Sequence, residues 1–184
     1  DPAMLAPPLM IPMVGNILAP AIGGGFGFLG LSAVAFGVGA FLWLAVLPLL
    51  LQRLLAGPPL PPRLLPSVVI LLAPPSVGAV ALPTLTGDVG LASLVLFGIA
   101  LFTALALLAA VPKIASAPFS PAFWGISFPT AAFALALSRQ VQAAPAVAGS
   151  VLFLVVLATV TGLIGWLAWR TARAAGQGAF LRPH

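Results

Sequence analysis

The uncharged run VGLASLVLFGIALFTALALLAAVP, residues 89–112, decides the fold. It is 24 residues long, and about 20 mostly apolar residues suffice for an α-helix to cross a bilayer. Its only proline is the last residue, so the residues before it can form one uninterrupted helix. The run therefore predicts a membrane-spanning helix between Asp88 and Lys113.

The rest of the chain has the same character. Hydrophobic residues make up 62% of the 184 residues and charged residues 5%, against about 25% charged in an ordinary soluble domain. Mean hydropathy is +1.24. Further uncharged stretches cover residues 2–52, 64–87, 114–138 and 140–169. The first is long enough for two helices and each of the others for one, so we predict an all-α integral membrane protein with six transmembrane helices.

Proline-rich connections group the six helices into three helical hairpins. AGPPLPPRLLP at residues 56–66 and SAPFSP at residues 116–121 cannot continue a helix. We place the hairpins at about residues 8–52, 64–111 and 122–169. The membrane domain then covers residues 7–170, and residues 171–184 form a basic cytoplasmic tail. Asp1 is no natural start, so residues 1–6 are interpreted as vector-derived.

The composition excludes most enzyme chemistry. The chain has no Cys, a single His at its last residue, and only Asp1 and Asp88 as carboxylates. Paired acids, a nucleophile with a His base and a metal cage all need more such side chains. We expect no catalytic residue, no metal and no cofactor. The net charge of +5 comes from cations scattered singly among apolar runs, so no nucleic-acid partner is expected.

The Lys and Arg residues predict the orientation in the membrane. Six lie on the side that includes the C-terminus: Arg53, Arg63, Lys113, Arg170, Arg173 and Arg182. Arg139 alone lies on the other side, so the positive-inside rule places the C-terminus in the cytoplasm. The first span is short and contains Pro12 and Pro20, and it is either one of the six crossings or a re-entrant or truncated segment. The side on which the chain begins depends on that choice.

Each odd-numbered span carries a proline near its middle. These are Pro12 in IPMVGN, Pro75 in PPSVGA and Pro129 in FPTAAF. A proline inside a helix leaves the carbonyl four residues earlier without its donor, which a membrane tolerates only against protein or a wet cavity. We expect the odd spans to kink, face inward and line a path, and the smooth even spans, including the one with Phe97, to face lipid. The alternative is that prolines are simply common in membrane helices.

Residues 119–139, FSPAFWGISFPTAAFALALSR, resemble the tellurite-resistance/dicarboxylate transporter family, which includes the plant guard-cell slow anion channels. IPMVGNILAPAIGG at 11–24 looks like the fifth helix of that family. QRLLAGPPLPPRLLPS at 52–67 looks like the turn into its seventh helix, and VVILLAPPSVGAVA at 68–81 like the seventh helix itself. The order and spacing of these four stretches carry the resemblance, which spans nearly the whole chain.

The resemblance implies a fold and an activity. Family members have ten helices arranged as five hairpins around a central pore that the odd helices line, and this chain would supply the last three hairpins. They move small inorganic anions or dicarboxylates as channels, exporters or carriers, and they look trimeric. We therefore expect a lipid bilayer and small anions as partners, a homotrimer, and a place in a bacterial inner (plasma) membrane.

The resemblance also implies site residues. The family closes its pore with a phenylalanine immediately before the proline of the ninth helix, which here is Phe128, next to Pro129. From the residues alone, packing against lipid or a neighbouring helix is the alternative. Arg139 lies about 16 Å further along the helix and either attracts anions to the mouth of the pore or reaches the headgroups. Ser76 and Thr130 either offer hydroxyls to an anion or bond back to their own helices.

A non-conducting membrane scaffold or assembly subunit is the alternative function. Glycines of the first hairpin would then pack closely against a partner. They are Gly23, Gly27, Gly37 and Gly39.

Overall fold

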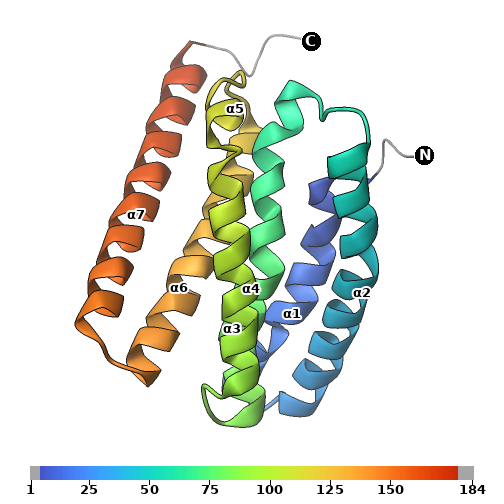
Figure 1. The fold of residues 1–184 in the computed structure, drawn as a ribbon, viewed down its shortest axis with the longest axis vertical. Coiled ribbons are helices and arrows are strands. Elements are labelled where there is room, and N and C mark those ends of the chain that lie inside the picture. Colours follow the sequence, from blue (N-terminus) through green and yellow to red (C-terminus); the bar gives the residue numbers. More distant parts are fainter. Residues whose placement is uncertain (1–4, 178–184) are drawn as a thin grey trace.

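The computed structural model describes residues 5–177, and every regular element within them is a helix (Figure 1). Six helical spans are long and apolar enough to cross a membrane. They are Pro7–Phe26, Leu29–Ala56, Pro62–Thr86, Leu91–Leu108, Pro121–Ala143 and Val147–Gly176. The predicted all-α membrane fold with six spans is therefore confirmed. Most of residues 1–6, and the end of the basic tail with Arg182, lie outside the described residues.

The even spans are single α-helices, whereas the odd spans join 3-10 turns to an α-helix. The even spans are α2 (Leu29–Ala56), α4 (Leu91–Leu108) and α7 (Val147–Gly176). The odd spans are η2 (Pro7–Met10), α1 (Ile11–Gly23) and η3 (Gly24–Phe26), then η4 (Pro62–Leu72) and α3 (Ala73–Thr86), then η5 (Pro121–Ile126) and α6 (Ser127–Ala143). A short helix, α5 (Val111–Ala115), follows α4. The first span reaches 20 residues only with its 3-10 turns, which is about the length that a crossing needs.

The three prolines lie at the junctions between 3-10 and α structure. Pro12 is the second residue of α1, and Pro75 and Pro129 are the third residues of α3 and α6. The sequence predicts kinks in the middle of α-helices. The structure instead places each proline in the first turn of an α-helix that continues directly from 3-10 structure, and proline is well tolerated in a first helical turn. The turn before the junction uses tighter bonds, such as the one that the Ala73 N–H donates to the Ile70 carbonyl.

The odd spans pack inside and the even spans outside, including α2 with its internal Pro48. In the apolar windows of 18 residues, buried residues make up 28, 67 and 39% of the first, third and fifth spans. The corresponding shares of the second, fourth and sixth spans are 17, 11 and 6%. Helix α3 is central, since it packs on α1, α4 and α6 (Figure 1). This burial agrees with the prediction that the odd spans face inward.

The first hairpin is held by a close approach of two helix backbones. A Cβ atom added at Gly39 of α2 would lie 2.7 Å from the Met13 carbonyl oxygen and 2.8 Å from the Ile17 nitrogen, both of α1. Only glycine allows this approach. At Gly37, by contrast, an added Cβ would meet open space. The contact of Gly39 is therefore made within the chain.

A polar link joins the second and third hairpins. The Ser93 hydroxyl of α4 donates a 2.8 Å hydrogen bond to the Ala79 carbonyl of α3. The Gln140 amide of α6 donates a 3.2 Å bond to the Ser93 oxygen. Ser93 is buried, and buried polar groups need such partners. Three helices from two hairpins therefore meet at one hydroxyl.

The two ends of the bundle differ in charge. Helix α5 and the C-terminal end of α7 lie at one end, and the turn between α3 and α4 lies at the other (Figure 1). Because the helices alternate in direction, the first end holds Arg53, Arg63, Lys113, Arg170 and Arg173. The opposite end holds Asp88 and Arg139. We call these the basic end and the opposite end.

Candidate functional site

Two neighbouring hollows lie on the common face of the three inner spans. The first is about 300 Å³ and is lined by Ile11, Val14, Gly15, Leu18, Ile70, Ala73, Gly125, Phe128 and Pro129. The second is about 200 Å³ and is lined by Leu18, Val77, Val80, Phe128, Ala131, Ala132 and Leu135. Every lining residue comes from an odd-numbered span. We call the two hollows together the inner groove.

Phe128 and Leu18 lie where the two hollows meet, because both residues line both hollows. Phe128 is the second residue of α6, and 46% of its surface is exposed. Leu18 approaches from α1 and is half-buried. An aromatic ring and an aliphatic side chain from two inner helices therefore divide the inner groove.

The inner groove is apolar at this level. None of the side chains that line its hollows is charged or carries a hydroxyl group. A dehydrated anion in such a place has no partner for its charge, and moving a charge from water into an apolar site is costly. A narrow apolar passage also excludes water. The chemistry of the groove is therefore that of a barrier.

The predicted hydroxyl groups do not lie in this groove. Thr130 follows Phe128 by two positions, about 200° around the helix, and lines a different cavity on the other side of α6. Its hydroxyl donates to the Ile126 carbonyl at 2.8 Å. Ser76 is fully buried, and its hydroxyl has no hydrogen-bond partner among the described residues. Neither side chain lines the hollows around Phe128.

The predicted prolines and Arg139 take different positions around the groove. Pro129 lines the first hollow, and Pro75 is fully buried. Pro12 is exposed and follows the lining residue Ile11. Arg139 is exposed near the end of α6, eleven residues after Phe128 and next to the hydrogen-bonded Gln140. The structure thus brings Phe128 and Pro129 together and leaves Arg139 at the opposite end of the bundle.

Leu18 is the residue of this site that sequence reasoning missed. It lies six residues after Pro12, whereas Phe128 immediately precedes its proline. No motif links these two positions, since the first spans of two hairpins meet here through the fold. The signal that remains in the sequence is the regular spacing of Ile11, Val14 and Leu18, which places them on one helix face.

Comparisons with known proteins show which family the chain resembles. The family model described as "SLAC1: Voltage-dependent anion channel" matches residues 1–172. The "Guard cell S-type anion channel SLAC1" of Arabidopsis thaliana is 29% identical over 133 residues. The match covers 72% of this chain and 24% of the plant protein. The chain therefore matches about a quarter of the length of this curated relative.

Proposed function

The chain belongs to the SLAC1 family of voltage-dependent anion channels, and from this premise we propose that it forms part of a Phe-gated pore for small inorganic anions or dicarboxylates. The resemblance to the tellurite-resistance/dicarboxylate transporter family, drawn from the sequence, is confirmed by these matches. Because the family is one of channels, its activity is transport rather than catalysis.

The observation that carries the proposal is the position of Phe128 between two hollows. A single partly exposed ring divides a groove that only the proline-bearing inner spans line. An apolar ring in a narrow path blocks anions by contact and by excluding water. Its place at the start of α6, next to the rigid Pro129, gives the ring a fixed base. Phe128 is thus the proposed gate, and Leu18 is the residue against which it closes.

The other predicted site residues, which are the three prolines, Arg139 and Thr130, have supporting roles in the proposal. Pro12, Pro75 and Pro129 set the junctions at which the inner spans change from 3-10 to α structure. Arg139 attracts anions to the mouth of the pore at the opposite end, since an exposed cation raises the local anion concentration. Thr130 is assigned to its own helix, to which its hydroxyl is bonded. With no cation in the groove, anions bind weakly, which suits conduction.

The proposed assembly follows from the family resemblance. The three hairpins supply part of a ten-helix, five-hairpin bundle, and two further hairpins complete the wall around the inner groove. Three such bundles form a homotrimer. The proposed setting is a bacterial inner membrane with the basic end in the cytoplasm, which agrees with the five described cations at that end.

The scaffold alternative loses its main support at Gly39. That glycine contacts α1 of the same chain, so its close packing is already used within the hairpin. A scaffold also has no need for an apolar groove divided by a partly exposed ring. An anion channel therefore explains the packing of these helices better than a scaffold does.

Anion flux in liposomes tests the proposal. The full-length protein that contains these residues is purified and reconstituted, a potassium gradient with valinomycin sets the voltage, and the release of chloride, nitrate or malate is followed. We expect release above that of protein-free liposomes, increasing with the protein-to-lipid ratio. A folded, monodisperse protein that releases none of these anions would favour the scaffold.

A further inference from the structure

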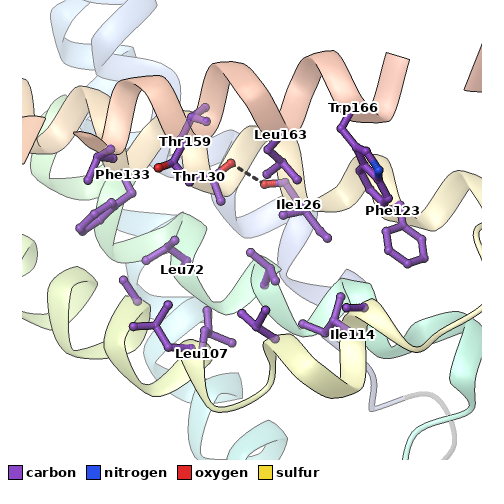
Figure 2. Close-up of a pocket in the computed structure, with 17 residues that line it drawn as sticks. Leu72, Leu107, Ile114, Phe123, Ile126, Thr130, Phe133, Thr159, Leu163 and Trp166 are labelled. Atoms are coloured by element: carbon purple, nitrogen blue, oxygen red, sulfur yellow. Dashed lines mark hydrogen bonds between the residues drawn. The ribbon is translucent and has the colours of Figure 1, made fainter. Parts of the chain in front are cut away.

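A second groove lies between the outer helices α4 and α7. It has a volume of about 460 Å³ and an almost wholly apolar lining (Figure 2). Leu107 of α4 and Leu163 of α7 lie on its two walls, and Leu72 and Phe133 of the inner spans form its floor. Both outer helices are largely exposed, so in a membrane this groove faces lipid. We call it the outer groove.

The outer groove leads to a cluster of aromatic and cationic side chains at the basic end. Trp166 lines the groove and meets Phe119 edge to face, with ring centroids 6.0 Å apart. The Arg170 guanidinium carbon lies 5.0 Å from the Phe119 ring centroid and 5.5 Å from that of Trp166. These cation–π contacts hold the guanidinium group beside the mouth of the groove.

A separate polar hollow begins where the outer groove ends. Arg170, Arg173 and Phe119 are among the residues that line it, so Phe119 joins the two sites. The Arg173 guanidinium carbon lies 5.5 Å from the Trp169 ring centroid. Two guanidinium groups near one hollow suit a phosphate, because each offers several N–H donors in a planar fork. The only carboxylate of the described chain, Asp88, lies at the opposite end.

We propose that the outer groove and the polar hollow together form a binding site for one anionic phospholipid. An acyl chain lies in the outer groove, and the headgroup phosphate binds Arg170 and Arg173. The dimensions agree: Thr159, which lines the groove, precedes Arg170 by eleven residues, or about 16 Å along the helix. That distance is close to half of the roughly 30 Å hydrocarbon core, the thickness of one leaflet.

The positions of the tryptophans place the headgroup level at the same height. Trp166 and Trp169 lie in the last turns of α7 before the two arginines, and Trp124 donates a 2.9 Å hydrogen bond to the Thr171 hydroxyl. Tryptophan is enriched at membrane–water interfaces. An acyl chain that starts at this level runs down the groove without leaving its leaflet. The site thus selects lipid by charge at one end and by an apolar channel at the other.

Lipid binding to the purified full-length protein tests the proposal. Phosphatidylglycerol and phosphatidylcholine with identical acyl chains are titrated into the detergent-solubilised protein, and bound lipid is counted by native mass spectrometry. We expect a preference for phosphatidylglycerol. Arg170→Gln with Arg173→Gln is expected to reduce that preference roughly 30-fold, about fivefold per cation near the surface. Arg63→Gln is the matched control, because Arg63 is exposed at the same end and lines neither the outer groove nor the polar hollow, and it should leave the preference unchanged.

Two threonines of α7 provide a matched pair of variants that tests whether an acyl chain lies in the outer groove. Thr159 lines the outer groove, whereas Thr161 does not, and both are exposed with hydroxyls that donate to their own helix at 2.8 Å. Thr159→Phe fills the groove and should lower the binding of both lipids. Thr161→Phe should leave lipid binding as it is. The pair separates loss of the site from a general effect of an added ring.

Three results would overturn the proposal. The first is equal binding of the two lipids to the unaltered protein, or a preference that survives the double arginine substitution. The second is inorganic phosphate competing fully with phosphatidylglycerol while Thr159→Phe has no effect, which would show an anion site without an acyl chain. The third is a disulfide between two copies of a Thr159→Cys variant in the membrane, which would show a second chain in the groove. None of these depends on whether the protein conducts anions.

Discussion

Phe97 of α4 stacks on Phe133 of α6, with ring centroids 5.9 Å apart and an angle of 12° between the ring planes. This pair connects the second hairpin to the third, and Phe97 is half-buried there. The span that contains Phe97 is largely exposed, as predicted for an outer helix, but Phe97 itself lies on the side of α4 that packs on an inner helix. Phe102 of the same helix is 73% exposed and is the suitable reference for a phenylalanine that lipid surrounds.

The orientation of the bundle is open to a labelling experiment, because the chain has no cysteine. Single cysteines replace Pro59, at the basic end, or Asp88, at the opposite end, and both positions are exposed. A membrane-impermeant thiol reagent applied to intact cells is expected to label residue 88 and spare residue 59. Lysed cells provide the control, in which both cysteines react. Labelling of residue 59 with protection of residue 88 in intact cells would reverse the orientation.

The close packing of the first hairpin predicts different effects at two glycines of α2. Gly39→Ala places a methyl group 2.7 Å from a backbone oxygen of α1, so the helices must separate, and we expect a loss of about 1–3 kcal/mol of stability. Gly37→Ala meets open space and should be neutral, or stabilising by up to about 1 kcal/mol through helix propensity. Unfolding of both variants in a denaturing detergent measures the difference. Equal stabilities would show that this approach of α1 and α2 does not hold in the membrane.

The link between Ser93 and Gln140 predicts a coupled loss of stability. Gln140→Leu removes one interhelical hydrogen bond, worth about 0.6 kcal/mol in a membrane protein. Ser93→Ala removes that bond and the one to the Ala79 carbonyl, so it should cost more. The double variant should lose less than the sum of the two, since both changes break the same bond. Gln142→Leu is the control, because Gln142 bonds only one turn back to Ser138 of its own helix, and strict additivity would contradict the link.

The sequence predicts the spans well because their signal is local. Twenty uncharged apolar residues have few alternatives to a transmembrane helix, and residues 89–112 show this from composition alone. The three prolines near the middle of the odd spans likewise mark the spans that pack inside, although the outer helix α2 also contains a proline, Pro48. Their exact structural effect was harder to foresee. A proline within an α-helix and a proline in the first turn after 3-10 structure have the same local sequence, so the sequence does not distinguish them. In the fold, the 3-10 segments η4 and η5, which precede two of these prolines, pack on each other.

The sequence could predict a residue of the candidate site only where the motif that marks it lies within one continuous segment of the chain. Phe128 is found from FWGISFP, residues 123–129, which lie within a single span. Leu18 belongs to another hairpin, and its place beside Phe128 depends on how α1 and α6 lie across α3. Thr130 lies two positions after Phe128, which turns its side chain to the other side of α6, and its hydroxyl bonds back to its own helix, which is one of the two predicted alternatives. Long-range contacts and helix rotation were thus the missing information.

Phe128→Ala in the full-length protein is expected to raise anion conductance strongly. The ring divides two hollows, so its removal joins them and lets water and anions through. Phe128→Leu should raise conductance less, since it keeps part of the apolar bulk, and Leu18→Ala should widen the same point from the other side. Phe102→Ala, on the lipid face, should change little. Single-channel or liposome flux measurements, normalised to folded protein, compare the four variants.

The same series separates a gate from a packing residue. A phenylalanine that only packs costs roughly 3–5 kcal/mol of stability when it is cut back to alanine in a core, and it lowers expression without raising flux. Phe128 is 46% exposed and lines open space on two sides, so its truncation should cost less than that. Phe97→Ala shows the packing outcome, since it removes the stack on Phe133 and should reduce stability at unchanged flux per folded molecule. If Phe128→Ala behaves like Phe97→Ala, the ring is ordinary packing and the gate lies elsewhere.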